Sequence, residues 1–87
     1  MSRSAFSSAY EIIVRELVAA RKNAGLTQVE LASRLSKPQS FVSKIERGER
    51  RVDTLEFCAI ATALGLVPSQ LLETVERQFP PNLADEI

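Results

Sequence analysis

The sequence predicts an all-α protein of five short helices. Three observations support this prediction: apolar residues recur at intervals of three and four, Thr27 and Asp53 each precede a glutamate by three residues, and the chain has only three glycines and four prolines. The glycines and prolines stand between or after the periodic segments, where they suit helix ends and leave little room for strands joined by tight turns. At 87 residues the chain can bury one modest core, so we expect a single domain over residues 1–87.

The first two helices are marked by a glycine stop and a capping box. Apolar residues spaced three and four apart line one face of the chain over residues 8–23, and Gly25 then supplies the left-handed stop that a helix end favours. Thr27 caps the second helix, because Glu30 completes a T-x-x-E capping box three residues later. This helix is short and ends near Leu35.

The third predicted helix begins at Pro38, whose missing N–H is not needed at the first helical position. It reaches Arg47, and Gly48 terminates it. Val42 and Ile45 are its two inward apolar anchors, which is a narrow stripe for a segment of this length. We therefore expect this helix to lie on the surface with most of its circumference exposed.

Two further helices follow. Asp53 caps the fourth helix, and Glu56 three residues later completes a second capping box. Gly65 ends the helix. Pro68 opens the fifth helix. The remaining residues 79–87, FPPNLADEI, contain two prolines and several acids, and we expect an extended or disordered tail there.

The composition disfavours several kinds of site. The single cysteine, Cys58, cannot form an intramolecular disulfide, and the lack of histidine removes the commonest zinc sites. Cys58 falls on the apolar side of the fourth helix, so we expect a buried structural thiol. No nucleophile stands beside a base, so we expect no enzyme activity, cofactor, metal or small-molecule ligand. No apolar run approaches about 20 residues, and we expect a cytoplasmic protein without membrane contact.

The net charge is zero, but the charges are unevenly distributed. Residues 1–51 hold ten lysines and arginines against five acidic residues, whereas residues 52–87 hold one against six. The basic half can still attract phosphates locally, because exposed charges farther apart than about 10 Å are screened at ordinary salt. The neutral total therefore does not exclude a nucleic-acid partner.

Residues 27–47 have the spacing of a helix-turn-helix. This motif needs a small residue in its first helix, a tight turn, and two apolar anchors in a second helix whose outer face stays free for a DNA groove. Ala32, Ser36, Val42 and Ile45 fill those positions. Taken alone, the polar outer face of the third helix is more typical of a solvated helix than of a DNA-binding one. The surrounding sequence is therefore needed to distinguish the two interpretations.

Four sequence blocks supply that context. They are "LTQ" at the start of the second helix, "LASRL" within it, "VSKIERGER" at the end of the third helix and "ATALGL" at the end of the fourth. In this order they resemble the phage-repressor-like (Cro/C1, or XRE) helix-turn-helix family over about residues 13–76. The resemblance implies a five-helix, lambda-repressor-like DNA-binding domain whose third helix enters the major groove of double-stranded DNA.

The resemblance also implies which residues contact DNA. Gln28 would meet a phosphate at the start of the second helix, whereas Gln39 suits adenine and Lys44 suits the acceptors of guanine. The three arginines that follow the third helix would run along the DNA backbone, since no acidic run nearby in the sequence neutralises them. Phe41 would contact a thymine methyl or a sugar, or would instead cover a neighbouring helix. The full set is Thr27, Gln28, Lys37, Gln39, Ser40, Phe41, Ser43, Lys44, Arg47, Arg50 and Arg51.

Two structural features follow from the same resemblance. Arg21 and Glu46 fall where the family forms an internal ion pair that ties the first helix to the third. Ser36 stands where the family prefers glycine in the turn. If Ser36 has a positive φ, serine costs on the order of 1 kcal/mol relative to glycine.

Together these observations predict a sequence-specific transcription regulator that binds an inverted-repeat operator as a homodimer. Leu72, Val75 and Phe79 are possible dimer contacts if they form an exposed strip on the fifth helix, and core residues otherwise. The alternative is an antitoxin-like protein-interaction module whose main partner is a toxin chain. Its contacts would include Val29, an apolar residue at a position that is usually polar, together with the fifth helix and the tail.

Overall fold

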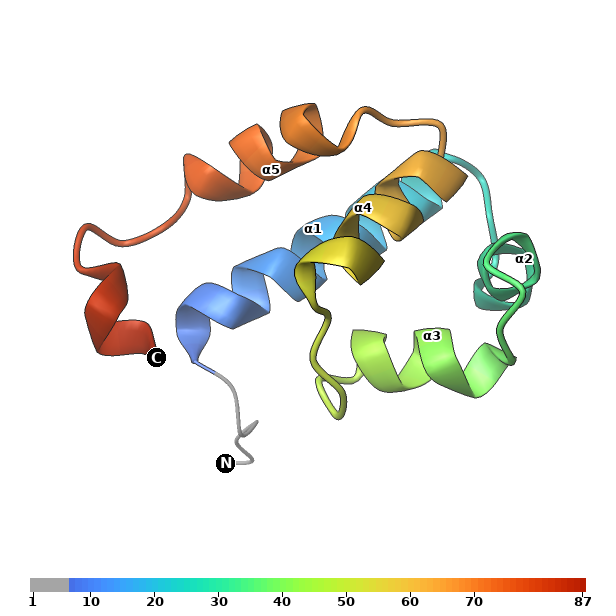
Figure 1. Cartoon of the computed structure of the whole chain (residues 1–87), viewed down its shortest axis with the longest axis horizontal. Coiled ribbons are helices and arrows are strands. Elements are labelled where there is room, and N and C mark those ends of the chain that lie inside the picture. Colours follow the sequence, from blue (N-terminus) through green and yellow to red (C-terminus); the bar gives the residue numbers. More distant parts are fainter. Residues whose placement is uncertain (1–6) are drawn as a thin grey trace.

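The structure is a computed structural model that describes residues 7–87 (Figure 1). Every regular element in this part of the chain is helical, and five α-helices are followed by a short 3-10 helix, η1. The predicted all-α fold class is therefore confirmed. The elements are α1 Ser8–Asn23, α2 Gln28–Arg34, α3 Gln39–Glu46, α4 Thr54–Ala63, α5 Pro68–Glu76 and η1 Leu83–Glu86.

Helix α1 is the central element of the fold. It packs against α3, α4, α5 and η1, while α2 packs against α3 and α4. Figure 1 shows α4 beside α1, α5 along one side of this pair and α3 along the other. The core between these helices contains Leu17, Ala20, Leu31, Ala32, Val42, Ile45, Phe57, Ile60, Ala61, Leu64 and Leu71.

Local sequence signals determine most helix ends. The two predicted capping boxes both form, one between Thr27 and Glu30 and one between Asp53 and Glu56. In each box the side chain of the first residue accepts an N–H of the first turn, and the glutamate accepts the N–H of the capping residue. Gly25 follows α1 with φ 77°, a left-handed conformation that costs glycine little.

Helix α3 starts one residue later than predicted. Pro38 is the N-cap, with φ −70° and ψ 157°, so the helix begins at Gln39 and ends at Glu46 with Arg47 as its C-cap. The fixed φ of proline suits either position, and the extended ψ of Pro38 places it just outside the helix. Its carbonyl oxygen accepts the N–H of Phe41 at 3.0 Å.

Helix α4 carries apolar or small residues on its outer side as well as on the face that meets the core. Cys58 is half-buried, so the prediction of a buried thiol is wrong. Its side chain lies with Ala59 and Thr62 on the outer side of α4, whereas Phe57 and Ile60 face the core.

Among residues 7–87 no single helix is long and apolar enough to cross a membrane. Only α4 and α5 together reach such a length and composition, and they are bent by 114° relative to each other.

The last residues of the chain are not extended as predicted. Within residues 79–87, η1 forms and packs against α1. The carboxylate of Glu86 accepts the N–H of Ala9 at 2.9 Å and the hydroxyl of Ser8 at 3.2 Å. The first turn of a helix carries unsatisfied N–H groups and a partial positive charge, and both favour a carboxylate. Because 77 positions separate Ala9 from Glu86, no local sequence pattern predicts this contact.

Candidate nucleic-acid interface

Helices α2 and α3 form a helix-turn-helix with a left-handed residue in its turn. Ser36 has φ 56° and is the one non-glycine residue with positive φ among residues 7–87. The N–H of Lys37 donates to the carbonyl of Ala32 at 2.9 Å, and the N–H of Ser36 donates to the carbonyl of Ser33 at 3.1 Å. These bonds satisfy the last carbonyls of α2 and hold the turn. Serine thus occupies the strained position, at a cost on the order of 1 kcal/mol relative to glycine.

Helix α3 is attached to the core by few side chains. Val42 and Ile45 are each 2% exposed and belong to the core, as the sequence predicted. Gln39, Ser40 and Lys44 are exposed on the opposite side, and Ser43 on the same side is half-buried. In a helix these positions share one face, so α3 presents a continuous polar surface.

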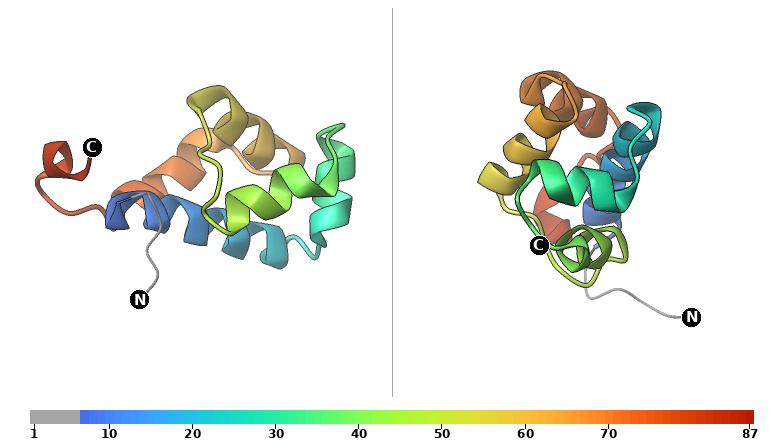
Figure 2. Two further views of the ribbon diagram at one scale, coloured as in Figure 1. Left: turned by 90° about the horizontal axis from the view of Figure 1, so that it is seen from below. Right: turned by 90° about the vertical axis from the view of Figure 1, so that its right-hand side faces the viewer.

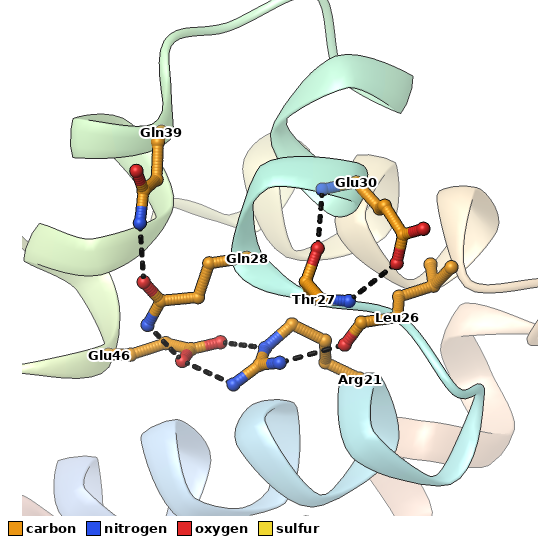
Figure 3. A network of polar contacts seen from close by, with 7 residues as sticks. All are labelled: Arg21, Leu26, Thr27, Gln28, Glu30, Gln39 and Glu46. Carbon is orange, nitrogen blue, oxygen red and sulfur yellow. Dashed lines mark hydrogen bonds and ion pairs between the residues drawn. The ribbon is translucent and has the colours of Figure 1, made fainter.

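An ion pair joins α1 to α3 below this surface. Nε of Arg21 lies 2.7 Å from Oε2 of Glu46, and Nη2 of Arg21 donates to Oε1 of Glu46 at 3.0 Å (Figure 3). Nη1 of Arg21 also donates to the carbonyl of Leu26 at 2.8 Å. The two charged side chains are only 10% and 9% exposed, so the pair is nearly dry. It fixes the position of the end of α3 relative to α1 and to the start of α2.

Two glutamine side chains extend this network to the outer face of α3. Nε2 of Gln28 donates to Oε1 of Glu46 at 2.8 Å, and Nε2 of Gln39 donates to Oε1 of Gln28 at 3.2 Å (Figure 3). Gln28, expected to meet a phosphate, thus also orients Gln39 in the structure. The amide of Gln39 keeps a second N–H and its carbonyl oxygen, which are the two groups that a bidentate contact with adenine requires.

Arg47 and Arg50, which follow α3, are both paired with glutamates. Arg47 binds Glu49 through bonds of 2.8 and 3.1 Å, and both side chains are 54% exposed. Arg50 binds Glu56 through two bonds of 2.9 and 2.8 Å. The sequence has no acidic run near these arginines, but in the structure a single glutamate pairs with Arg47 and another with Arg50. Arg50 therefore links the loop after α3 to the first turn of α4.

The aromatic ring of Phe41 packs beneath cationic groups. The ring is half-buried against the core, with the guanidinium of Arg50 4.7 Å and the ammonium of Lys37 5.6 Å from its centroid. Cations are attracted to the faces of aromatic rings, so Phe41 positions both basic side chains. The ring therefore packs on the core of its own domain, and a contact of Phe41 with DNA stays a prediction.

The loop between α3 and α4 is also braced by Tyr10, a residue that the sequence reasoning did not select. The Tyr10 hydroxyl accepts the N–H of Val52 at 3.0 Å, and the guanidinium of Arg51 lies 4.6 Å from the ring centroid. Burial raises the pKa of the Tyr10 hydroxyl above its ordinary value of 10.0. Tyr10 and Val52 are 42 positions apart, so only the tertiary structure reveals this support.

The paired carboxylate of Glu56 is expected to make the stability of the fold depend on pH in the acid range. Its hydrogen bonds with Arg50 and with the N–H of Asp53 lower the pKa of Glu56 from 4.5 to about 2. A lowered folded-state pKa stabilises the fold above the unfolded pKa, and this contribution disappears as the pH falls through the folded pKa. We therefore expect the free energy of unfolding to fall between about pH 4.5 and about pH 2.

Denaturant unfolding across this pH range measures the effect, with Glu56→Gln as the matched variant. Glutamine keeps the shape but cannot titrate, so the variant is expected to lose less stability than the wild type as the pH is lowered over this range. Identical pH dependence in both proteins would show that the Arg50 pair and the capping box do not hold the Glu56 carboxylate in its charged form.

The three possible dimer contacts do not form one exposed strip. Val75 is 0% exposed and lies inside the folded chain, so it cannot contact a second copy. Leu72 is 48% exposed on α5, and Phe79 is half-buried near η1. The proposed strip is therefore wrong for Val75. The spacing of three and four along α5 fits a buried face as well as an exposed one, so the sequence alone did not separate them.

Comparison with known proteins agrees with this geometry. A helix-turn-helix family model matches residues 17–72, which is more than half of the chain. Among solved structures, an XRE-family like protein from Pseudomonas syringae pv. tomato str. DC3000 is 45% identical, with a TM-score of 0.79 and coverage of 84% of this chain and 89% of that chain. A comparison with curated proteins gives no match.

Two restriction-modification controller proteins are also similar. C.AhdI from Aeromonas hydrophila is 34% identical, with a TM-score of 0.62 and coverage of 68% of this chain and 86% of that chain. The C.Esp1396I tetramer in complex with its natural 35 base-pair operator shares the fold at 21% identity, with a TM-score of 0.74 and coverage of 82% and 93%. With the family model matched across the helix-turn-helix and α4, this chain belongs to the Cro/C1-type (XRE) helix-turn-helix family of DNA-binding transcription regulators.

Proposed function

We propose that this protein is a sequence-specific transcription regulator that binds an inverted-repeat operator as a homodimer, with α3 in the major groove of each half-site. The observation that carries the proposal is the attachment of α3 by Val42 and Ile45, which leaves its polar face exposed. Such a helix can enter a groove without unfolding any other part of the domain. Action on an operator would place the protein in the cytoplasm.

Base recognition is assigned to two side chains on this face. Gln39 would read adenine through its remaining amide N–H and carbonyl oxygen, and its bond to Gln28 orients it before DNA arrives. Lys44 is exposed near the end of α3 and would reach the acceptors of guanine. Ser40 and Ser43 share the same face and would supply shorter contacts.

Affinity is assigned to the residues that flank α3. Lys37, Arg47 and Arg51 would contact phosphates, together with Thr27 and Gln28 at the start of α2. Arg50 is expected to contribute less than Arg47, because the side chains of Arg50 and Glu56 are 40% and 24% exposed, whereas both partners of the Arg47 pair are 54% exposed and separate more easily. These contacts fix register and orientation and carry no sequence information directly.

A second copy is part of the proposal because one α3 makes few base contacts. Two recognition helices about 34 Å apart would read half-sites separated by one turn of DNA. Each mismatched base pair then costs about 1 to 3 kcal/mol in a site twice as long, which gives useful discrimination.

Selection of bound sequences from random double-stranded DNA tests the proposal. The expected result is enrichment of an inverted repeat whose half-site centres lie about 10 base pairs apart. The matched control is the double variant Gln39→Ala/Lys44→Ala, which alters only exposed side chains and should enrich no such repeat. If the wild type enriches nothing beyond the control, the protein is not a sequence-specific regulator.

One observation favours the antitoxin-like alternative. Val29 is 57% exposed on α2, where an apolar side chain gains nothing from water. A toxin partner covering Val29 would co-purify as an unrelated small chain, and Val29→Ser would release it. The homodimeric regulator requires no such chain.

A further inference from the structure

The peptide unit that joins Arg51 to Val52 is held on both of its sides. Its carbonyl oxygen accepts an N–H from Nη1 of Arg50 at 2.7 Å, and its N–H donates to the hydroxyl of Tyr10 at 3.0 Å. Arg50 is itself bound to Glu56 of α4 by two hydrogen bonds. Although the loop after α3 has no regular secondary structure at this point, its backbone is therefore fixed from α4 and from α1.

Tyr10 also sets the direction of the Arg51 side chain. Arg51 is exposed, but its guanidinium lies 4.6 Å from the centroid of the Tyr10 ring, and Tyr10 is only 5% exposed. Such stacking uses the face of the guanidinium, whereas a bidentate contact with a phosphate uses the N–H groups in its plane. Stacking therefore orients Arg51 through a contact that itself occupies none of these N–H groups.

The turn of α1 that carries Tyr10 is in contact with the end of the chain. Glu86 of η1 accepts the N–H of Ala9 and the hydroxyl of Ser8, the two residues before Tyr10. In Figure 1 and in the left view of Figure 2, the start of α1 lies between η1 and the loop after α3. One small cavity of about 190 Å³ is lined by Tyr10, Arg51 and Glu86, together with Phe79, Leu83 and Ile87. The end of the chain thus packs beside the residue that orients Arg51.

We propose that Tyr10 and the C-terminal segment, residues 79–87, are positioning elements for DNA binding that hold Arg51 where it contacts a backbone phosphate. This inference rests on the proposed phosphate contact of Arg51. Holding a long arginine side chain before DNA arrives reduces the side-chain entropy that the contact would otherwise cost. The C-terminal segment therefore raises DNA affinity without touching DNA. It does so equally on every sequence, because phosphate contacts carry no sequence information directly.

The charge of the C-terminal segment makes the sign of this effect informative. The segment contains two acidic residues, Asp85 and Glu86, and no basic residue. By charge alone, loss of either acid should strengthen binding to DNA, which is also negatively charged. Asp85 is exposed, and its side chain makes no hydrogen bond or ion pair within residues 7–87, whereas Glu86 is bonded to α1. The proposal therefore predicts opposite results for the two acids.

Equilibrium titrations of the full chain with the selected operator and with unrelated DNA, at one salt concentration, test the role of the C-terminal segment. Glu86→Ala is expected to weaken binding about 2-fold or more per copy and equally on both DNAs. The matched control is Asp85→Ala, which removes the same charge from the neighbouring position and should bind as tightly as the wild type or more tightly. Ser7 still caps α1 in both variants, so both are expected to fold.

Variants of Tyr10 show whether the effect passes through Arg51. Tyr10→Leu removes the ring and is expected to weaken binding about 2-fold to 5-fold per copy, as for loss of one exposed cation–ring contact. Tyr10→Phe keeps the ring and should retain most of the affinity. In a chain that already carries Arg51→Gln, Tyr10→Leu should cause no further loss, because the effects of residues that act through one another do not add. Leu71→Ala, a change in the core, controls for a general loss of stability and should leave the affinity unchanged.

Two results would overturn this inference. One is an equal effect of Glu86→Ala and Asp85→Ala on the affinity, and the other is full addition of the Tyr10→Leu and Arg51→Gln losses in the double variant. If Tyr10→Leu does not fold, the comparison of the two acids decides alone. A wild type that selects its inverted repeat while Glu86→Ala binds like Asp85→Ala refutes this inference and leaves the proposed function standing. A wild type that selects no sequence refutes the proposed function itself.

Discussion

Replacing Glu46 with alanine is expected to lower the free energy of unfolding by about 3 to 5 kcal/mol. The change leaves the guanidinium of Arg21 charged and buried, with the carbonyl of Leu26 as its remaining contact in the network (Figure 3). An unpaired buried charge costs far more than the net value of the pair, since neither water nor a carboxylate then solvates it. Gln28 loses its acceptor at the same time. Denaturant unfolding measures the loss.

Glu49→Ala is the matched control, because it also removes a glutamate from a bidentate arginine pair. The Arg47 and Glu49 side chains are both 54% exposed, so a much smaller loss of stability is expected, because water solvates the charge of Arg47 when Glu49 is removed. Similar small losses in both variants would show that burial does not distinguish the two ion pairs and that Glu46 does not anchor α3.

The affinity for operator DNA is expected to fall about 10³-fold to 10⁵-fold between about 50 and 200 mM salt. This range corresponds to about six to ten phosphate contacts per homodimer, each of which releases condensed counterions. Lys37, Arg47 and Arg51 are the basic residues beside α3 that we assign to these contacts. Equilibrium binding titrations at several salt concentrations give the slope.

Arg77→Gln serves as the control for the salt slope. Arg77 pairs with Glu73 at 3.0 Å and follows α5, outside the helix-turn-helix, so its removal should leave the slope unchanged. Lys37→Gln should reduce the slope by about one unit for each copy bound. A slope near zero for the wild type would show that these residues do not contact phosphates.

The helices could be predicted because their signals are local. Thr27 with Glu30, and Asp53 with Glu56, mark two helix starts within four residues of chain, and the structure forms both capping boxes. The spacing of Val42 and Ile45 likewise places α3 on the surface without any tertiary information. Pro38 shows the limit of such signals, because its φ allows two adjacent roles and only its ψ distinguishes them.

The contacts that complete the site could not be predicted in the same way. The bond from Gln28 to Glu46 joins residues 18 positions apart, and the bond from Gln39 to Gln28 depends on how α2 and α3 pack. Glu86 reaches α1 from the other end of the chain. Helical spacing shows that residues share a face but not what covers that face, and for this reason the sequence allows Val75 as a dimer contact although it is buried in the structure.

DNA binding by Lys44→Ala tests whether the outer face of α3 reads base edges. The affinities of the wild type and the variant are measured for the selected operator and for unrelated DNA at one salt concentration, with Lys22→Ala on α1 as a control for loss of one exposed positive charge. If Lys44 contacts a base, Lys44→Ala loses about 1 to 3 kcal/mol of binding free energy on the operator and much less on unrelated DNA. Equal losses on both DNAs would assign Lys44 to the phosphates and show that it does not read a base.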